Sequence, residues 1–206
     1  MALRQSNGFL PDLDGISPKV AEKARLMFLN FPNNPTSATA DKGFFEKAVA
    51  FASKFNIVVA HDAAYSEIAF DGYKPPSFLE FPGSKDVGVE FHSLSKTFNM
   101  TGWRIGWVCG NSTVVSALAK VKSNIDSGIF QAIQIAGITA LKEGASVVEQ
   151  NNKIYADRTQ IFVDGLKALG WNVNKPKASF YVWAKLPRKA KSSIEFAQIL
   201  LDRANI

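Results

Sequence analysis

The sequence of 206 residues contains one cysteine, two histidines and no long uninterrupted apolar run. Cys109 cannot form a disulfide within the chain, which excludes a disulfide-stapled secreted domain and predicts a free, buried thiol in the cytoplasm. His61 and His92 lack neighbouring ligands at metal-site spacing, so we expect both to be structural and no metal to bind. No stretch reaches about 18 apolar residues, and the start of the chain lacks the apolar core of a signal peptide. We therefore expect no association with a membrane.

The charge balance is basic, with a formal net charge of +6 and a pI of about 9.4. The positive side chains are scattered, and the one local cluster comprises Arg188, Lys189 and Lys191. A nucleic-acid-binding protein usually carries a basic stripe or a recognisable binding module, and the sequence has neither. We expect no nucleic-acid partner.

The hydrophobic pattern predicts alternating strands and helices in the first part of the chain. Short apolar or β-branched runs predict strands over 26–29, 57–60, 87–91 and 104–109. The periodicity over 41–54 predicts a helix with Asp41 as its N-cap. Further helices are expected over 114–121, 130–141, 147–169 and 193–203, with a strand over 180–186. This order indicates an α/β fold with a mostly parallel sheet.

Polar side chains follow the predicted strands at the points where the strands end. Open α/β sheets bind ligands at the carboxyl ends of their strands, where the loops converge. The set comprises an amide, a carboxylate, a phenol, two hydroxyls, an amine and a guanidinium: Asn34, Asp62, Tyr65, Ser93, Ser95, Lys96 and Arg104. Together they suit a cofactor with a ring nitrogen, a phenolic oxygen, an aldehyde and a phosphate.

Three motifs in this order resemble the class I and II aminotransferases of the fold-type I pyridoxal-phosphate superfamily. Asn34-Pro35-Thr36 resembles the family's Asn-Pro-Thr-Gly turn, and Asp62 to Tyr65 resembles its Asp-x-x-Tyr element. Ser93 to Phe98 followed by Gly102 to Gly106 resembles its lysine signature. The resemblance implies a three-layer α/β/α large domain with a mixed, mostly parallel sheet over 1–145. It further implies part of a small α+β domain over 146–206.

The resemblance also implies a role for each residue of the set. Lys96 would bind the aldehyde of pyridoxal 5'-phosphate as a Schiff base and then act as the base at the substrate's Cα. Asp62 would pair with the pyridine nitrogen and keep it protonated. Tyr65 and Asn34 would hydrogen-bond the phenolic oxygen of the cofactor.

The phosphate is expected to contact Arg104, whose planar donors suit that group, with help from the hydroxyls of Ser93 and Ser95. Ser37 departs from the family pattern, because glycine often follows Asn-Pro-Thr there, and serine changes the geometry that the turn permits. The chain also resembles an internal fragment. The phosphate-holding turn, the ring-stacking aromatic and the arginine for the substrate carboxylate cannot be assigned, so we expect the isolated chain to be inactive.

Longer phrases, such as Ser95 to Arg104 and Lys122 to Gln134, resemble LL-diaminopimelate aminotransferases. That resemblance implies transfer between an amino acid and a 2-oxo acid in lysine biosynthesis, by a protein that forms a homodimer when complete. Alanine- or aspartate-type aminotransferases and fold-type I C–S lyases or synthases share the same site residues and stay open as alternatives. A cofactor-binding sensor domain is a non-enzyme alternative, disfavoured because no basic winged-helix segment precedes the motifs.

Overall fold

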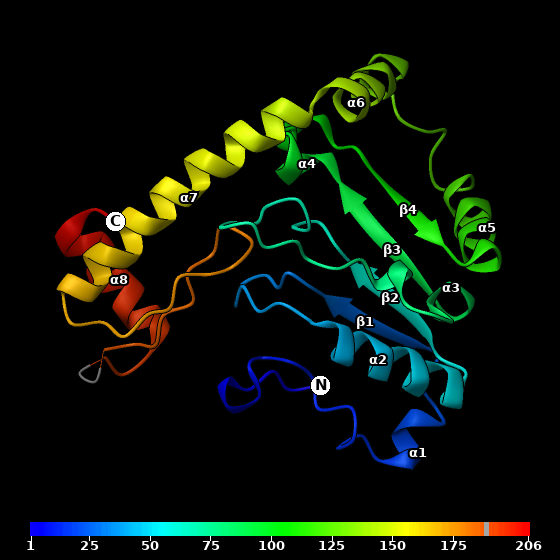
Figure 1. The fold of residues 1–206 in the computed structure, drawn as a ribbon, viewed down its shortest axis with the longest axis horizontal. Coiled ribbons are helices and arrows are strands. Elements are labelled where there is room, and N and C mark those ends of the chain that lie inside the picture. The colour runs from blue at the N-terminus through cyan, green and yellow to red at the C-terminus, as the bar shows by residue number, and fades with distance from the viewer. Residues whose placement is uncertain (188–189) are drawn as a thin grey trace.

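The computed structural model describes residues 1–187 and 190–206 of the chain (Figure 1). Arg188 and Lys189, two members of the basic cluster in the sequence, lie outside the described residues. Across the described parts of the chain, no helix is both long and apolar enough to cross a membrane.

A four-stranded sheet forms the centre of the fold, in the order β1-β2-β3-β4. Its strands are β1 (Leu26–Asn30), β2 (Val58–Asp62), β3 (Gly88–Ser93) and β4 (Gly106–Gly110). The first three are parallel, and β4 runs antiparallel to β3. The predicted mixed, mostly parallel sheet is therefore confirmed. Because β4 is reversed, it begins at the same edge at which β1, β2 and β3 end.

Helix α2 (Lys42–Phe55) covers one face of this sheet (Figure 1). Its predicted N-cap is confirmed, because the Asp41 carboxylate accepts a hydrogen bond of 2.8 Å from the amide of Phe44. Alternate residues of β1 face the helix, so Met27 and Leu29 are buried, while Phe28 on the other face is 69% exposed. The core between helix and sheet consists mainly of apolar side chains from both elements: Met27, Leu29, Phe44, Phe45, Ala48, Val49, Ala52, Ile57 and Val59.

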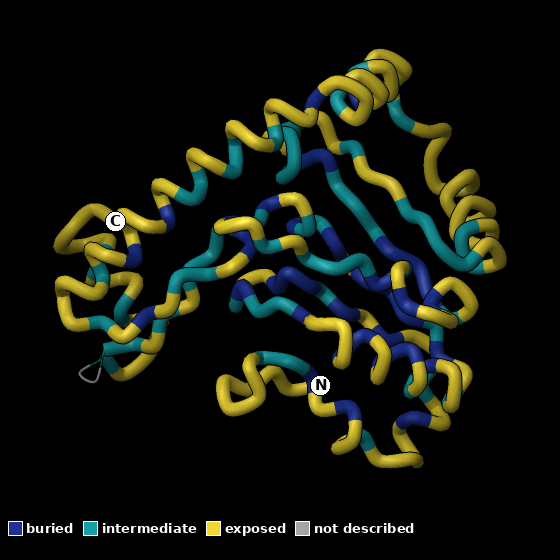
Figure 2. The backbone as a smooth tube through the Cα atoms, viewed as in Figure 1, coloured by how far each residue is buried: buried dark blue, intermediate teal, exposed yellow. Residues whose placement is uncertain are grey.

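Shorter helices connect the strands and shape the loops. They are the 3₁₀ helices η1 (Gln5–Asn7), η2 (Phe78–Glu80) and η3 (Thr101–Trp103) and the α-helices α1 (Pro18–Ala21), α3 (Ser84–Val87) and α4 (Leu94–Thr97). The later helices are α5 (Ser112–Lys122), α6 (Gln131–Glu143), α7 (Ala145–Ala168) and α8 (Ser193–Ala204). All four were predicted, with slightly different ends. Figure 2 shows that exposed residues predominate along α5, α6 and α7.

The strand predicted over 180–186 is wrong. Residues 180–186 form no strand, and within the described part of the chain Ala178 forms an isolated antiparallel bridge with Ala69. The alternating apolar side chains are satisfied differently, since Phe180 and Tyr181 pack against Tyr65. Side-chain packing in a cluster thus replaces the strand pairing that the alternation indicated.

Candidate functional site

The residues predicted to form a site follow the strands at one edge of the sheet. Asp62 is the last residue of β2 and Ser93 the last of β3, and the two strands pair in parallel. Lys96 lies in α4, directly after β3, and Arg104 directly follows η3. The amide of Leu94 donates to the carbonyl of Ile105 at 3.2 Å. The loop that carries the lysine and the arginine is therefore closed at its base.

Asp62 is exposed and lies beside an open hollow of about 340 Å³. One oxygen of its carboxylate accepts from the amide of Ala64 at 3.1 Å. Its backbone carbonyl accepts from the side-chain amide of Asn30 at 3.1 Å, which ties the ends of β1 and β2 together. Aromatic, polar and small residues at the ends of three strands line the hollow: Phe28, Asp62, Ala64, Phe91, His92 and Ser93.

Lys96 is half-buried, and its Nζ lies 5.8 Å from the centre of the Phe180 ring. Within the described parts of the chain, no carboxylate forms a salt bridge with it. An amine held near an aromatic ring without an acidic partner is available to react with a ligand.

Ser95 and Arg104 are connected through Thr101. The Thr101 hydroxyl donates to the carbonyl of Ser95 at 3.0 Å, and a guanidinium nitrogen of Arg104 donates to the carbonyl of Thr101 at 2.9 Å. The hydroxyl of Ser93 accepts from the amide of Ser95 at 3.1 Å. Arg104 is exposed and, among the described residues, has no acidic partner.

Tyr65 is buried, and its hydroxyl meets two polar groups. The side-chain amide of Asn34 donates to it at 3.4 Å. The loops after β1 and β2 thus bring together two residues of the predicted set. The hydroxyl of Tyr181 lies 2.7 Å away. Burial and then the contact with Tyr181 raise the pKa of Tyr65 well above its ordinary value, so the phenol keeps its proton.

Tyr181 was not among the residues predicted from the sequence. It lies 116 positions beyond Tyr65, in the segment that was assigned to a strand. The run of aromatic residues from Phe180 was the available signal, but alternation alone does not say which surface such residues contact.

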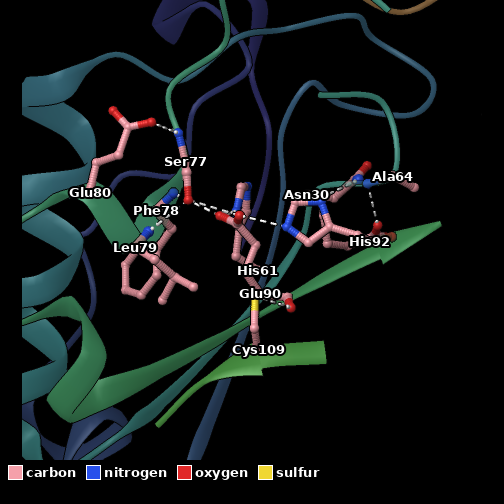
Figure 3. A network of polar contacts seen from close by, with 11 residues as sticks. Asn30, His61, Ala64, Ser77, Phe78, Leu79, Glu80, Glu90, His92 and Cys109 are labelled. Carbon is pink, nitrogen blue, oxygen red and sulfur yellow. Dashed lines mark hydrogen bonds and ion pairs between the residues drawn. The ribbon is translucent and has the colours of Figure 1, made fainter. Parts of the chain in front are cut away.

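Strand β3 also carries a buried carboxylate, Glu90, that belongs to a network of polar contacts (Figure 3). Glu90 is 1% exposed, and its oxygens contact His61 Nδ1 at 2.9 Å and His92 Nε2 at 2.8 Å. The hydroxyl of Ser77 donates to it at 2.8 Å and the amide of Phe78 at 2.7 Å. The prediction that both histidines are structural agrees with these contacts, and no metal-like cluster occurs among the residues that the structure describes.

This network supports the two strand ends that carry the site. His61 precedes Asp62, and His92 precedes Ser93 while stacking on Trp107 with ring centres 5.1 Å apart. Burial alone would raise the pKa of Glu90, but the hydrogen bonds from the two histidines outweigh it and hold that pKa well below its usual range. The carboxylate is therefore ionised, and its hydrogen bonds connect β2, β3 and the loop at Ser77.

The donor set fits a cofactor with a phosphate, an aldehyde and a pyridine ring. Asp62, Lys96 and Arg104 are charged and share one edge, yet no salt bridge joins any two of them in the described parts of the chain. Charged groups that converge without pairing mark a candidate ligand site.

Comparisons with known proteins agree with this chemistry. The model of the family described as aminotransferase class I and II matches residues 1–206. The chain is 53% identical over 206 residues to an LL-diaminopimelate aminotransferase of Moorella thermoacetica, covering 100% of this chain and 53% of that protein. A protein of the same name from Syntrophobacter fumaroxidans is 54% identical over the same coverage. The chain thus spans about half the length of the curated relatives it matches.

Solved structures show the same fold. The apo structure of BacF from Bacillus subtilis matches with a TM-score of 0.95 and 44% identity, covering 100% of this chain and 55% of that one. An aminotransferase from Staphylococcus aureus matches with a TM-score of 0.90 and 34% identity, covering 96% of this chain and 52% of that one. The α/β fold predicted from the sequence is confirmed by both.

Proposed function

The chain belongs to the class I and II aminotransferases, and on this basis we propose that it is the cofactor-binding part of an enzyme that transfers an amino group between an amino acid and a 2-oxo acid. The convergence of Asp62, Lys96 and Arg104 at one edge of the sheet, without mutual salt bridges, carries the proposal. We further propose that 1–145 form most of the large domain and 146–206 part of a small one, since α7 leads away from the sheet (Figure 1).

The family uses pyridoxal 5'-phosphate, which supplies, when bound, an electron sink for the electron pair left on the substrate's Cα. Asp62 would hold the ring nitrogen and its proton. Tyr65 and Asn34 would bind the phenolic oxygen. Arg104, Ser93 and Ser95 would bind the phosphate, a role that the exposed guanidinium and the neighbouring hydroxyls suit.

Lys96 would have two duties. Its Nζ would anchor the cofactor covalently, and the released amine would then take the proton from the substrate's Cα and deliver it to the cofactor carbon that had carried the aldehyde. The position of Nζ supports both duties, because the amine lies 5.8 Å from the centre of the Phe180 ring and, among the described residues, forms no salt bridge that would occupy it.

For the substrate we propose LL-diaminopimelate, with glutamate and 2-oxoglutarate as the second pair. The support is identity of 53% and 54% to relatives that carry this name. The chain covers 53% of those relatives, so we propose that the complete protein, as a homodimer, performs the reaction and that these 206 residues alone show weak or no turnover.

Covalent trapping tests the assignment of Lys96. The chain is mixed with pyridoxal phosphate, reduced with borohydride, digested and analysed by peptide mass spectrometry. We expect one reduced adduct, on Lys96, that disappears in Lys96→Gln. Lys177→Gln is a matched control, because Lys177 Nζ also lies 5.8 Å from an aromatic ring, that of Tyr73. An adduct that survives in Lys96→Gln, or that forms mainly at another lysine, would contradict the proposal.

The substrate proposal has its own test. The complete protein is incubated with LL-diaminopimelate and 2-oxoglutarate, and glutamate formation is measured. Alanine and aspartate serve as competing donors. Faster transfer from either of them than from LL-diaminopimelate would refute the substrate assignment but leave the aminotransferase proposal intact.

A further inference from the structure

Two serines with unusual backbone geometry meet beside Tyr65. Ser37 has φ of 58° and Ser179 has φ of 63°, in the left-handed region that side chains other than glycine rarely adopt. They lie 142 positions apart, yet their hydroxyl oxygens are 2.7 Å apart, and both residues are buried. Such residues persist where the surrounding structure holds them, and they concentrate at functional sites.

The hydrogen bonds around these serines form a closed ring with a defined direction. The Ser37 hydroxyl donates to the carbonyl of Tyr181 at 2.6 Å, which uses its single proton. It must therefore accept the proton of the Ser179 hydroxyl. The amide of Tyr181 in turn donates to the Ser179 hydroxyl at 3.3 Å. Both backbone polar groups of Tyr181 are thus held by serine side chains.

The same segment is also tied to the loop that follows Tyr65. The amide of Ser179 donates to the carbonyl of Ile68 at 2.8 Å, and the amide of Phe70 donates to the carbonyl of Lys177 at 3.0 Å. Residues 177–181 are therefore fixed to the loop after β1 through Ser37 and to the loop after β2 through these two bonds.

Because residues 177–181 are fixed in this way, Tyr181 is held next to the Tyr65 hydroxyl and limits its hydrogen bonds. A phenol oxygen can both donate its proton and accept hydrogen bonds. Asn34 donates to Tyr65 at 3.4 Å, and Tyr181 lies 2.7 Å away with a hydroxyl proton of its own. In the bond between Tyr65 and Tyr181 either hydroxyl can donate; once another acceptor takes the Tyr65 proton, the Tyr181 hydroxyl can donate to Tyr65 instead and hold the phenol at that acceptor.

We propose that Ser37, Ser179 and Tyr181 form a serine latch that positions Tyr65, so that its hydroxyl donates to the phenolic oxygen of the cofactor. Tyr181 and the two serines are positioning residues, since they act through Tyr65. This inference rests on the proposed function for the identity of the acceptor, whereas the latch itself rests on the contacts within the chain.

Ser37 gives the latch a sequence signature. The family that this chain resembles often has glycine after Asn-Pro-Thr, and glycine adopts a positive φ without strain but has no hydroxyl. In this chain the hydroxyl connects Ser179 to Tyr181, so replacing it leaves the carbonyl of Tyr181 without that donor.

The latch is tested by ¹³C NMR of the chain labelled at tyrosine Cζ, whose resonance responds to hydrogen bonding at the phenol oxygen. The chain has four tyrosines, and loss of one signal in Tyr65→Phe assigns Tyr65. We expect Ser37→Gly, Ser179→Ala and Tyr181→Phe each to shift the Tyr65 resonance. Ser37→Gly is the decisive variant. It removes the hydroxyl, and glycine adopts the positive φ of this position without strain, so a shifted resonance cannot be attributed to a strained backbone.

Ser84→Ala is the matched control. Ser84 is fully buried, and its hydroxyl has no hydrogen-bond partner within the described residues, so its loss should leave the Tyr65 resonance in place. A Tyr65 resonance that moves no further in Ser37→Gly than in Ser84→Ala overturns the latch.

A second readout uses the cofactor. In chains loaded with pyridoxal phosphate, the pH at which the cofactor's absorbance changes should differ between wild type and Ser37→Gly but not between wild type and Ser84→Ala. Equal midpoints for wild type and Ser37→Gly overturn the link between the latch and the cofactor. The NMR experiment needs no cofactor, so failure of Lys96 to form an adduct would refute the proposed function without touching that result.

Discussion

Replacement of Glu90 measures how much the buried network contributes to stability. Its carboxylate accepts from His61, His92, Ser77 and the amide of Phe78, with 1% of the residue exposed. Leucine at this position has a similar volume and no acceptor. Removing one partner of a buried charge network costs about 3–5 kcal/mol, so we expect Glu90→Leu to lower the free energy of unfolding by about 4 kcal/mol.

Glu90→Gln separates charge from shape. The glutamine carbonyl can accept from the amide of Phe78 and from His61, while its NH₂ group faces Ser77 and His92. Both of these can accept, because the hydroxyl rotates and the imidazole can change tautomer. Only the assistance of the negative charge is lost. Since charge-assisted hydrogen bonds are roughly twice as strong as neutral ones, we expect a loss of about 2 kcal/mol.

The stability difference between wild type and Glu90→Gln should depend on pH. The pKa of Glu90 lies well below its ordinary value of 4.5, because the hydrogen bonds from the histidines outweigh the effect of burial. A carboxylate with a lowered pKa in the folded state stabilises fully above its unfolded pKa and loses that contribution as the pH falls. The difference between wild type and Glu90→Gln should therefore be complete at about pH 7 and shrink below about pH 4.5.

The assay is urea unfolding, followed by circular dichroism, at about pH 7 and again below about pH 4.5. Glu67→Gln serves as the control, because Glu67 is exposed and its carboxylate forms no salt bridge with the described residues. Equal midpoints for Glu90→Gln and Glu67→Gln at about pH 7 would refute the reasoning. A difference that grows on acidification would refute its electrostatic part.

Three further predictions concern other elements. Gly110→Ala should lower the free energy of unfolding by about 3 kcal/mol in a urea titration, because φ is 128° and an added Cβ would lie 2.5 Å from the carbonyl of Gly88; an unchanged midpoint would contradict this. Asp41→Ala should cost about 1 kcal/mol through loss of the N-cap of α2, whereas a loss near zero in the same titration would mean that the cap is not needed. Burial and the charge of Glu90 raise the pKa of the Cys109 thiol. Labelling of Cys109 by a thiol reagent at about pH 7 should therefore be slow, and it should be faster in Glu90→Gln. Rapid labelling of the wild type would contradict this prediction.

The local parts of the fold were predictable because their causes are local. The β-branched run that ends at Ala60 produced β2, and the apolar spacing after Asp41 produced α2 with its cap. Asp62 and Ser93 were also expected where strands end, and they are the last residues of the parallel strands β2 and β3.

Contacts between distant segments were not predictable from pattern alone. Alternation over 180–186 indicated a strand, but Tyr181 packs against Tyr65 instead. Ser37 was noted as a departure from a glycine position, yet nothing in its neighbourhood points to Ser179, 142 positions away. Such partners depend on how the segment after α7 returns to the loops of the sheet, which no local periodicity encodes.

The antiparallel direction of β4 divides the site into two mechanical parts. The chain leaves the sheet at Ser93 and re-enters it opposite, at Gly106, so Lys96 and Arg104 travel on one closed loop. Tyr65, in contrast, contacts residues 180–181, which lie beyond the end of α7. Movement of the region beyond α7 would therefore change the contacts of the Tyr65 phenol and the position of the Phe180 ring beside Lys96, while Lys96 and Arg104 stay on one loop. The backbone that carries Lys96 and Arg104, the residues proposed to bind the aldehyde and the phosphate, would stay with the sheet, and the aromatic side of the site at Tyr65 and Phe180 would respond to that movement.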